Sequence, residues 1–276
     1  RRRQRQMCIR DRLGSGTRHR LLQPQSRDQP ELVDVSAWLD RVPVGEPAIG
    51  LILAALDVDI DNGAAWNRWY DLEHLAPNLS LPDVVTGHRY VAPPDLHDCR
   101  IAPADDPVWG QGRSVYLTWY ATSVDPAAAI SAMSTRRDEL DAAGRMDGAG
   151  ARVVRSGDAL TLLSTASAPN LRLDEHDLVH VGHVGLRLVI DREERVASLG
   201  PGVAASLRFG SAFAPGRFAE LQLLTEDPRS VLDQLRSSEE ERSVEVDAAF
   251  DRIEPLRYPF LVAIESSSLP RRVDED

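Results

Sequence analysis

The sequence contains no lysine, because all 32 basic residues of its 276 are arginine. This absence excludes Schiff-base chemistry and lysine general bases. Aromatic residues make up only 5% of the chain, and the two cysteines, Cys8 and Cys99, form no zinc-ligand spacing. Neither a disulfide framework nor a structural metal is indicated, and a reduced, cytoplasmic setting is expected.

Long hydrophobic runs are also lacking, since no apolar stretch approaches the roughly 20 residues that span a bilayer. The net charge of -11 argues against a nucleic-acid partner, which requires a contiguous basic face. The common nucleotide-binding, hydrolase and zinc-protease motifs are absent. We therefore expect no membrane partner and no cofactor, although haem ligation by His74 or His183 is left open.

Residues 1–47 predict a basic and irregular lead-in to the folded part of the chain. Residues 1–12 carry six arginines, and their string MCIRDR resembles a translated sequencing-adapter remnant. We expect these twelve residues to be non-native. The alternative is a short basic arm that binds an acidic partner.

Residues 48–170 predict a first ferredoxin-like unit. The expected elements are a strand at 48–60, a helix capped by Asp61 or Asn62 and ended by Pro82, strands at 86–92 and 114–123, a helix from Asp125-Pro126 to about Ala143, and a strand region at 151–166 that is continuous or a hairpin around Gly157-Asp158. The order strand, helix, strand, strand, helix, strand is that of the split βαβ motif.

Residues 171–276 repeat this plan in degenerate form. The expected elements are a strand at 180–191, a shortened helix at 192–199, strands at 202–211 and 218–225, a helix that opens at Asp227-Pro228, and a closing strand at 257–266. Leu207-Arg208-Phe209 echoes His88-Arg89-Tyr90. Two such units predict an α+β fold in which tandem ferredoxin-like βαββαβ sheets pack as a pseudo-dimeric α/β barrel. The protein would be a monomer by this internal pairing, or a homodimer.

The segment Trp66–His74 concentrates three large aromatic residues beside a Glu-His pair. At 100° per residue, one helix face carries Trp66, Trp69, Tyr70, Glu73 and His74, and the other carries Ala65, Leu72, Leu75, Ala76 and Leu79. A helix that only covers a sheet needs the aliphatic face alone. The aromatic face therefore predicts the wall of a pocket.

This segment, with Pro77 and Pro82 and the following Gly87-His88-Arg89-Tyr90, resembles the signature of EthD-like proteins of the dimeric α/β barrel superfamily. The resemblance covers residues 48–123. It implies a cavity between helix and sheet into which His74 points. It also implies a small hydrophobic or aromatic ligand, because the superfamily includes cofactor-free dehydratases, cyclases, isomerases and monooxygenases, together with haem-binding branches.

His74 is the candidate general base, since an imidazole exchanges a proton near neutral pH. The alternative is a histidine held by hydrogen bonds at the end of a packed helix. Tyr70 or Tyr116 would donate a hydrogen bond to the ligand. Glu73 would orient a neighbour, or form a structural ion pair with Arg68 or Arg89.

The expected ligand-binding side chains come from the helix and from two strands: Trp66, Trp69, His88, Arg89, Tyr90, Tyr116 and Tyr120. Trp66 and Trp69 would stack on a flat ligand or fill the space between helix and sheet. His88 and Tyr90 share one strand face and Arg89 takes the other. Tyr116, Thr118 and Tyr120 form a row that lines a pocket or lies between the sheets.

The histidines of the second half do not predict a metal site. His180 and His183 have a spacing that suits a metal only in a helix, and the surrounding Val-Gly pattern favours a strand.

Two functions therefore remain open. One is a cofactor-free proton-transfer enzyme that acts on a hydrophobic or aromatic metabolite. The other is a non-catalytic, ligand-binding or structural member of the same fold.

Overall fold

The computed structural model describes residues 46–150, 152–171, 173–238 and 243–270, together with the backbone of two short strands near the N-terminus. The chain divides into two compact parts, residues 1–45 and 46–276. In the first part, β1 (Arg20–Gln23) and β2 (Glu31–Asp34) form an antiparallel pair. The prediction about residues 1–12 lies outside the described residues.

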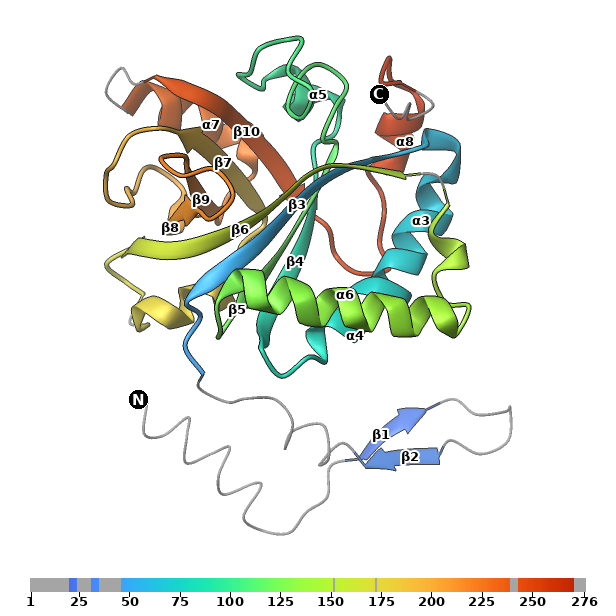
Figure 1. Ribbon diagram of the computed structural model, residues 1–276. Helices are drawn as coiled ribbons and strands as arrows, with labels where there is room; N and C mark the ends of the chain where they lie inside the picture. The colour runs from blue at the N-terminus through green and yellow to red at the C-terminus, as the bar shows by residue number, and fades with distance from the viewer. Residues whose placement is uncertain are drawn as a thin grey trace. The chain divides into compact units, whose positions relative to one another are not determined.

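The second part is an eight-stranded closed barrel in which every neighbouring pair of strands is antiparallel (Figure 1). Its strands are β3 (Gly50–Val58), β4 (Val84–Val91), β5 (Tyr116–Thr122), β6 (Arg152–Ser167), β7 (Gly185–Asp191), β8 (Val203–Ser211), β9 (Phe218–Leu224) and β10 (Val244–Arg252). Their order around the barrel is β10-β4-β5-β3-β6-β8-β9-β7.

This order contains two ferredoxin-like sheets, so the predicted fold is confirmed. Strands β3 to β6 make the first repeat and β7 to β10 the second, and in each the spatial order is second, third, first, fourth. The fourth strand of each repeat pairs with the second strand of the other. The β6–β8 pairing is long, from Leu160 to Ser167, whereas β10 pairs with β4 only at Asp251 and Arg252.

The same close contact between a strand and a helix occurs inside each repeat, which supports their origin by duplication. A Cβ added to Gly50, the first residue of β3, would lie 2.2 Å from Cγ of Pro126, which opens the second helix of the first repeat. A Cβ on Gly185, the first residue of β7, would lie 2.3 Å from Cγ of Pro228 in the same place of the second repeat. Each repeat therefore needs a glycine where helix and sheet approach most closely.

Helices cover the outer face of the first repeat more fully than that of the second. The helices are η1 (Ile60–Asn62), α3 (Gly63–Trp69), the π-helix η2 (Tyr70–Leu75), α4 (Ala76–Leu79), α5 (Pro94–Asp98), α6 (Pro126–Ala142), η3 (Asp147–Ala149), η4 (Glu175–His180), α7 (Pro228–Ser238) and α8 (Leu261–Glu265). As predicted, α6 begins at Asp125-Pro126, and the carboxylate of Asp125 accepts the backbone N–H of Ala128. Asn62 stands at the N-terminus of α3, but its side chain makes no capping hydrogen bond there, contrary to the prediction. None of the helices in the described part is long and apolar enough to cross a membrane.

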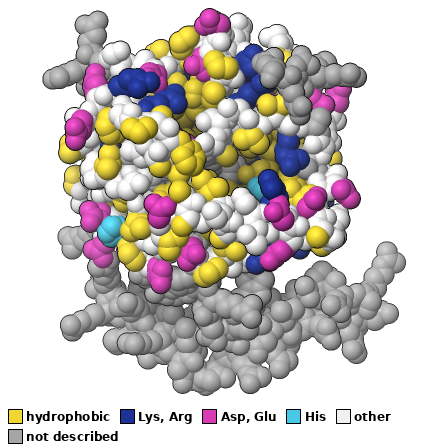
Figure 2. Space-filling model, viewed as in Figure 1, with side chains coloured by type: hydrophobic (Ala, Val, Ile, Leu, Met, Phe, Trp, Pro, Cys, Tyr) yellow, Lys and Arg dark blue, Asp and Glu magenta, His cyan; other side chains and the backbone are white. Residues whose placement is uncertain are grey.

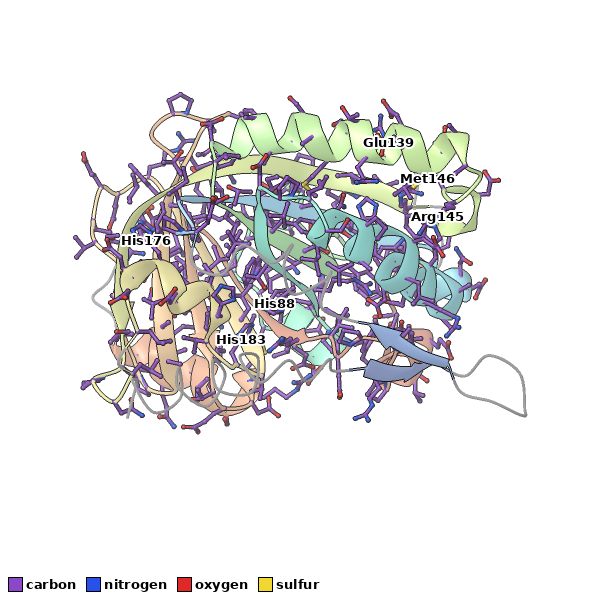
Figure 3. The ribbon with its side chains drawn as sticks, turned by 90° about the horizontal axis from the view of Figure 1, so that it is seen from below. His88, Glu139, Arg145, Met146, His176 and His183 are labelled. Carbon is purple, nitrogen blue, oxygen red and sulfur yellow. The ribbon has the colours of Figure 1, made fainter. Side chains whose placement is uncertain are left out.

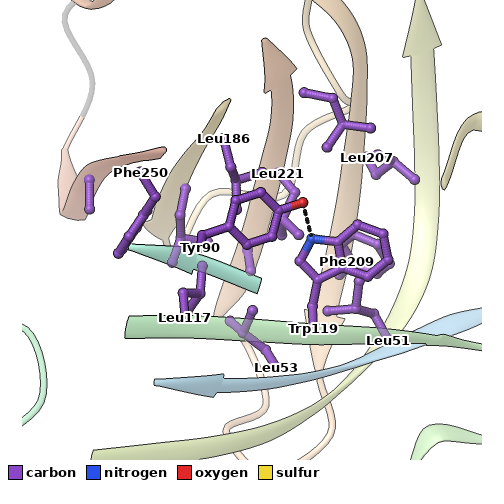
Figure 4. Packing of buried hydrophobic residues seen from close by; sticks show 14 of the residues in the cluster. Leu51, Leu53, Tyr90, Leu117, Trp119, Leu186, Leu207, Phe209, Leu221 and Phe250 are labelled. Carbon is purple, nitrogen blue, oxygen red and sulfur yellow. Dashed lines mark hydrogen bonds between the residues drawn. The ribbon is translucent and has the colours of Figure 1, made fainter. Parts of the chain in front are cut away.

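The barrel interior is the main hydrophobic core (Figure 4). Strand β3 shows how the sequence builds it: Leu51 and Leu53 point into the barrel, while Ile52 points out towards the helices. Since both faces of this strand are covered, it reads as a continuous apolar run. The large interior side chains include Tyr90, Trp119, Leu186, Phe209 and Phe250.

Two predicted elements of the second half are wrong, and a third, the strand predicted at 180–191, begins later than predicted. Residues 192–199 form no helix, β7 begins at Gly185 after the 3-10 helix η4, and the closing strand is Val244–Arg252. Residues 257–266, predicted as that strand, contain the short helix α8. Pro255 and Pro259 interrupt strand pairing there. In the first half, Gly157-Asp158 lies inside one continuous strand, β6, and makes no hairpin.

Buried charges replace the missing helix of the second repeat. Arg208 on β8 is fully buried and forms an ion pair with Asp191 at the end of β7. Glu220 on β9 is also buried and accepts the backbone N–H of Ser198, while Arg195 pairs with both acids. The irregular segment 192–202 is therefore held on this face by polar contacts, which a helix with an apolar face would not make.

The glycine contacts predict a matched response to mutation. Gly50→Ala and Gly185→Ala should each destabilise the fold by about 1–3 kcal/mol, because the new methyl group overlaps a proline ring and a backbone oxygen. Gly157→Ala is the control, since a Cβ there meets nothing within 4 Å. Urea unfolding measures all three. Equal stability of the Gly50 and Gly157 variants would contradict the assigned contact.

Candidate functional site

The aromatic face of the Trp66–His74 segment packs inward, against the outer face of the first sheet. Trp66 is 0% exposed, and Trp69 and Tyr70 are also buried. The face predicted to cover the sheet is largely turned outward, since Leu72 is 41% exposed and Leu79 is 38% exposed. The prediction that the aliphatic face covers the sheet was therefore wrong, whereas the alternative that Trp66 and Trp69 fill the space between helix and sheet is correct.

A π-helix, Tyr70–Leu75, forms the second half of the segment. A π-helical turn bonds residue i to i+5, so the 100° spacing assumed from the sequence does not hold through it. Asp71 is buried as a result, whereas Glu73 stays partly exposed. Glu73 forms an ion pair with Arg145, 2.5 Å away. The predicted structural ion pair is therefore present, but the partner is Arg145 and neither Arg68 nor Arg89.

Arg89 is the polar centre of this layer. Its Nη1 lies 2.5 Å from Oδ1 of Asp71, and its Nη2 lies 2.5 Å from Oδ1 of Asn67. Its guanidinium carbon is 4.9 Å from the ring centroid of Trp66 and 4.3 Å from that of Tyr70. These four partners compensate and enclose the charge of Arg89. They fill the space between the helix and the sheet, where a ligand was expected.

Asp71 also binds the chain near its C-terminal end. Its Oδ2 accepts the backbone N–H of Leu256 at 2.8 Å and the hydroxyl of Tyr258 at 2.6 Å. Leu256 has a φ of 63°, a left-handed conformation that a leucine rarely adopts. Burial and the Asp71 carboxylate raise the pKa of Tyr258. The carboxylate of Asp71 therefore fixes an unfavourable turn, and sequence reasoning had passed over this residue.

His74 lies between two rings of its own segment. Its ring centroid is 5.6 Å from that of Trp69, in a stacked arrangement, and 4.7 Å from that of Tyr70. Burial, followed by the charges of Arg152 and Arg89, lowers the pKa of His74 to about 4. Its Nδ1 is buried and has no hydrogen-bond partner among the described residues. The imidazole is therefore neutral at pH 7 and retains an unused polar atom.

The tyrosine row of β5 faces the same layer. The hydroxyl of Tyr116 accepts a hydrogen bond from Nδ2 of Asn67 at 3.3 Å, and burial raises its pKa to about 12. The hydroxyl of Tyr120 lies 3.5 Å from that of Tyr70. Both tyrosines belong to the hydrophobic cluster that contains Trp66 and Trp69. The structure thus brings these predicted residues together as a packed layer.

Tyr90 and His88 point the other way, into the barrel, as the strand alternation predicted. Nε1 of Trp119 donates to the Tyr90 oxygen at 2.8 Å (Figure 4), and the Tyr90 hydroxyl lies 2.7 Å from Nε2 of His183. Nδ1 of His183 lies 2.7 Å from the carbonyl of Val181. A carbonyl only accepts, so Nδ1 carries the proton and Nε2 accepts from Tyr90. The Tyr90 hydroxyl and both ring nitrogens of His183 therefore all have hydrogen-bond partners.

His88 and His183 lie side by side at one end of the barrel, where Figure 3 labels both. Nη2 of Arg252 lies 3.1 Å from Nδ1 of His88, and Nη1 donates to the carbonyl of His183 at 3.2 Å. Burial and the charge of Arg252 lower the pKa of His88 to about 3, and burial lowers that of His183 to about 4. Among the described residues, no three His, Cys, Asp or Glu side chains are grouped to hold a metal.

A large cavity lies elsewhere, beside the short β10–β4 pairing. It is an open groove of about 1100 Å³, which we call the C-terminal groove, lined by residues of α5, the start of α7, the end of β10 and segment 253–267. Its apolar wall consists of Pro93, Pro94, Ile253, Pro259 and Phe260. Figure 2 shows one face of the molecule, on which hydrophobic side chains lie among acidic and basic ones. None of the predicted site residues lines the groove.

Comparisons with known proteins do not show a family for this chain. No family model matches the sequence, and no curated protein is similar to it. The similar solved structures include a provisionally assigned chlorite dismutase (12% identity, TM-score 0.41) and provisionally assigned monooxygenases from Fusobacterium nucleatum (6%, 0.40) and Lactobacillus acidophilus (8%, 0.37). Each match covers 75% of this chain and 95%, 94% and 93% of the respective structure. The resemblance to EthD-like proteins stays a prediction.

Removing the charge of Arg89 should be costly. Arg89→Met leaves the buried carboxylate of Asp71 without its cation, a loss of about 3–5 kcal/mol. Arg145→Met breaks the exposed pair with Glu73 and should cost less than about 1 kcal/mol. The free energy of urea unfolding distinguishes the two variants. If both lose the same small amount, Arg89 does not organise this layer.

The neutral histidines predict that acid weakens the fold. His74, His88 and His183 have folded-state pKa values of about 4, 3 and 4, below the ordinary 6.5. The unfolded chain then binds more protons between pH 6.5 and about 4, so the free energy of unfolding should fall through this range. Urea unfolding at pH 7.5 and 5.0 measures the fall. His183→Asn should reduce it, because the buried neutral imidazole is then gone.

Proposed function

We propose that this protein binds a small, largely hydrophobic molecule in the C-terminal groove. The observation that carries the proposal is the groove itself, an open hollow of about 1100 Å³ with an apolar wall of proline, isoleucine and phenylalanine side chains. Ligand sites are typically concave, mainly apolar and provided with a few polar groups. The predicted ligand class, a small hydrophobic or aromatic molecule, suits this wall.

The construction of the wall also supports binding. Segment 253–267 forms one side of the groove and is tied to the first repeat through Leu256 and Tyr258, which both donate to Asp71. Phe260 packs its ring edge against Tyr116, 6.2 Å between centroids. A wall fixed in this way is formed before the ligand arrives, which lowers the entropy lost on binding.

Filling the groove should abolish binding without unfolding the protein. Ala263 is exposed and lines the groove, so Ala263→Trp should block it. Val262 is the neighbouring residue on α8, is 71% exposed and does not line the groove, so Val262→Trp is the matched control. A thermal-shift screen of hydrophobic and aromatic metabolites should find compounds that raise the melting temperature of the wild type and of Val262→Trp only.

The opposite result is equally clear. Ligands that stabilise Ala263→Trp as strongly as the wild type bind elsewhere, and the groove is then not the site. The proposal also fails if no compound of the screen stabilises the wild-type protein.

A second candidate is cofactor-free proton transfer at His74, as the resemblance to EthD-like proteins implies. The buried, unpartnered Nδ1 of His74 favours it, because a neutral imidazole nitrogen is able to accept a proton from a ligand. Tyr70, beside it, would supply the hydrogen bond. The same screen separates the two functions, since a ligand bound at His74 is retained by Ala263→Trp and lost from His74→Ala.

A further inference from the structure

The C-terminal groove is lined by equal numbers of basic and acidic side chains, but its arginines differ in whether a carboxylate contacts them. Three arginines and three carboxylates line it. Arg229 is saturated, because its guanidinium contacts both Asp95 and Asp251. These partners raise the pKa of Arg229, and Asp227 adds a third carboxylate 3.2 Å away. The positive charge of Arg229 is therefore already compensated by carboxylates of the protein, so it attracts an anionic ligand little.

Arg257 is also paired. Its Nη1 lies 3.1 Å from the carboxylate of Glu254, and both side chains are mostly exposed to solvent. An exposed pair of this kind is weak, and water screens its charge. Arg257 therefore offers the groove little directed attraction.

Arg252 differs from both. Its guanidinium donates to His88 Nδ1 and to the backbone carbonyl of His183, and both acceptors are neutral. No carboxylate of the described residues lies within 4 Å of it, although it is half-buried and lines the groove. Arg252 is thus an arginine of the groove without a carboxylate partner among the described residues, and beyond these two bonds its guanidinium donates to none of them.

The two acceptors also fix the direction of Arg252. His88 is held by Trp119, 4.8 Å between ring centroids, and by His183 at 5.2 Å. Arg252 only donates, so Nδ1 of His88 accepts and the single proton of its neutral imidazole lies on Nε2. An arginine oriented by neutral groups is suited to a planar anion, because a carboxylate accepts two parallel hydrogen bonds from a guanidinium.

We propose that the ligand of the C-terminal groove is a small carboxylic acid with an apolar body, whose carboxylate binds Arg252 while the body lies on the wall around Phe260. This inference rests on the proposed function and makes it more specific. It assigns Arg252 the role of selecting the anion, with His88 as the residue that positions it. The apolar wall supplies affinity, and the guanidinium discriminates the acid from neutral molecules of the same shape.

Matched pairs of probes test the inference. We would use 2-naphthoate, indole-3-acetate and octanoate, each beside its primary amide, and measure dissociation constants by calorimetry and ligand-observed NMR. The amide keeps the size and the apolar body of the acid and removes only the charge. The wild-type protein should bind at least one acid about tenfold or more tightly than its amide, as expected for a charge-assisted pair that replaces a neutral one.

Arg252→Gln should remove this preference and leave the binding of the amide almost unchanged. Arg257→Gln is the matched control, an arginine of the same groove that already has a carboxylate partner, and it should keep the preference. Arg252→Lys retains the charge without the bidentate geometry and should give an intermediate ratio. Circular dichroism and the melting temperature establish that each variant is folded.

The failures are distinguishable. If acids and amides bind the wild type equally and Ala263→Trp blocks both, the groove is a binding site and the carboxylate inference is wrong. If the preference persists in Arg252→Gln, another group selects the anion. If neither acids nor amides bind, the inference fails, and the wider screen with Ala263→Trp decides separately on the groove.

Discussion

The ion pair between Arg89 and Asp71 is the contact on which the rest of the structure depends. It joins β4 to the π-helix, and the second carboxylate oxygen joins the π-helix to Leu256 and Tyr258. A buried pair of charges is stable only when its remaining polar atoms are bonded, and here Asn67 and these two donors complete it. One carboxylate thus orders the aromatic layer and the wall of the C-terminal groove together.

The second repeat has a buried arginine at the equivalent position, but its carboxylate partner comes from a different element. Arg208 lies where the sequence echo of Arg89 placed it, is buried, and contacts the ring of Phe218 at 5.1 Å. Its carboxylate comes from Asp191 at the end of β7, so no helix is required to supply one. This explains how the second repeat retains its sheet without a counterpart of α3, and why the aromatic segment occurs once.

The sequence was sufficient for the fold, and much less so for the site. Alternating residues and the Asp125-Pro126 and Asp227-Pro228 helix starts predicted the elements of the first repeat and the second helix of each repeat, because these signals are local, whereas the helix at 192–199 and the strand at 257–266 were wrong. The orientation of Trp66–His74 was not local: it depends on a π-helix and on partners 18 and 187 residues away in the chain. The C-terminal groove was missed for the same reason, since its walls are brought together only by barrel closure at Arg252 and Ile253.

The most direct test of this account is amide hydrogen exchange of Asp71→Asn beside the wild type. An amide side chain in place of the carboxylate loses the pair with Arg89 and weakens the hold on Leu256 and Tyr258. The account predicts faster exchange throughout residues 253–260, with β9 of the second repeat unchanged. Unaltered protection of residues 253–260 would contradict it, because the groove wall would then stand without the Asp71 carboxylate.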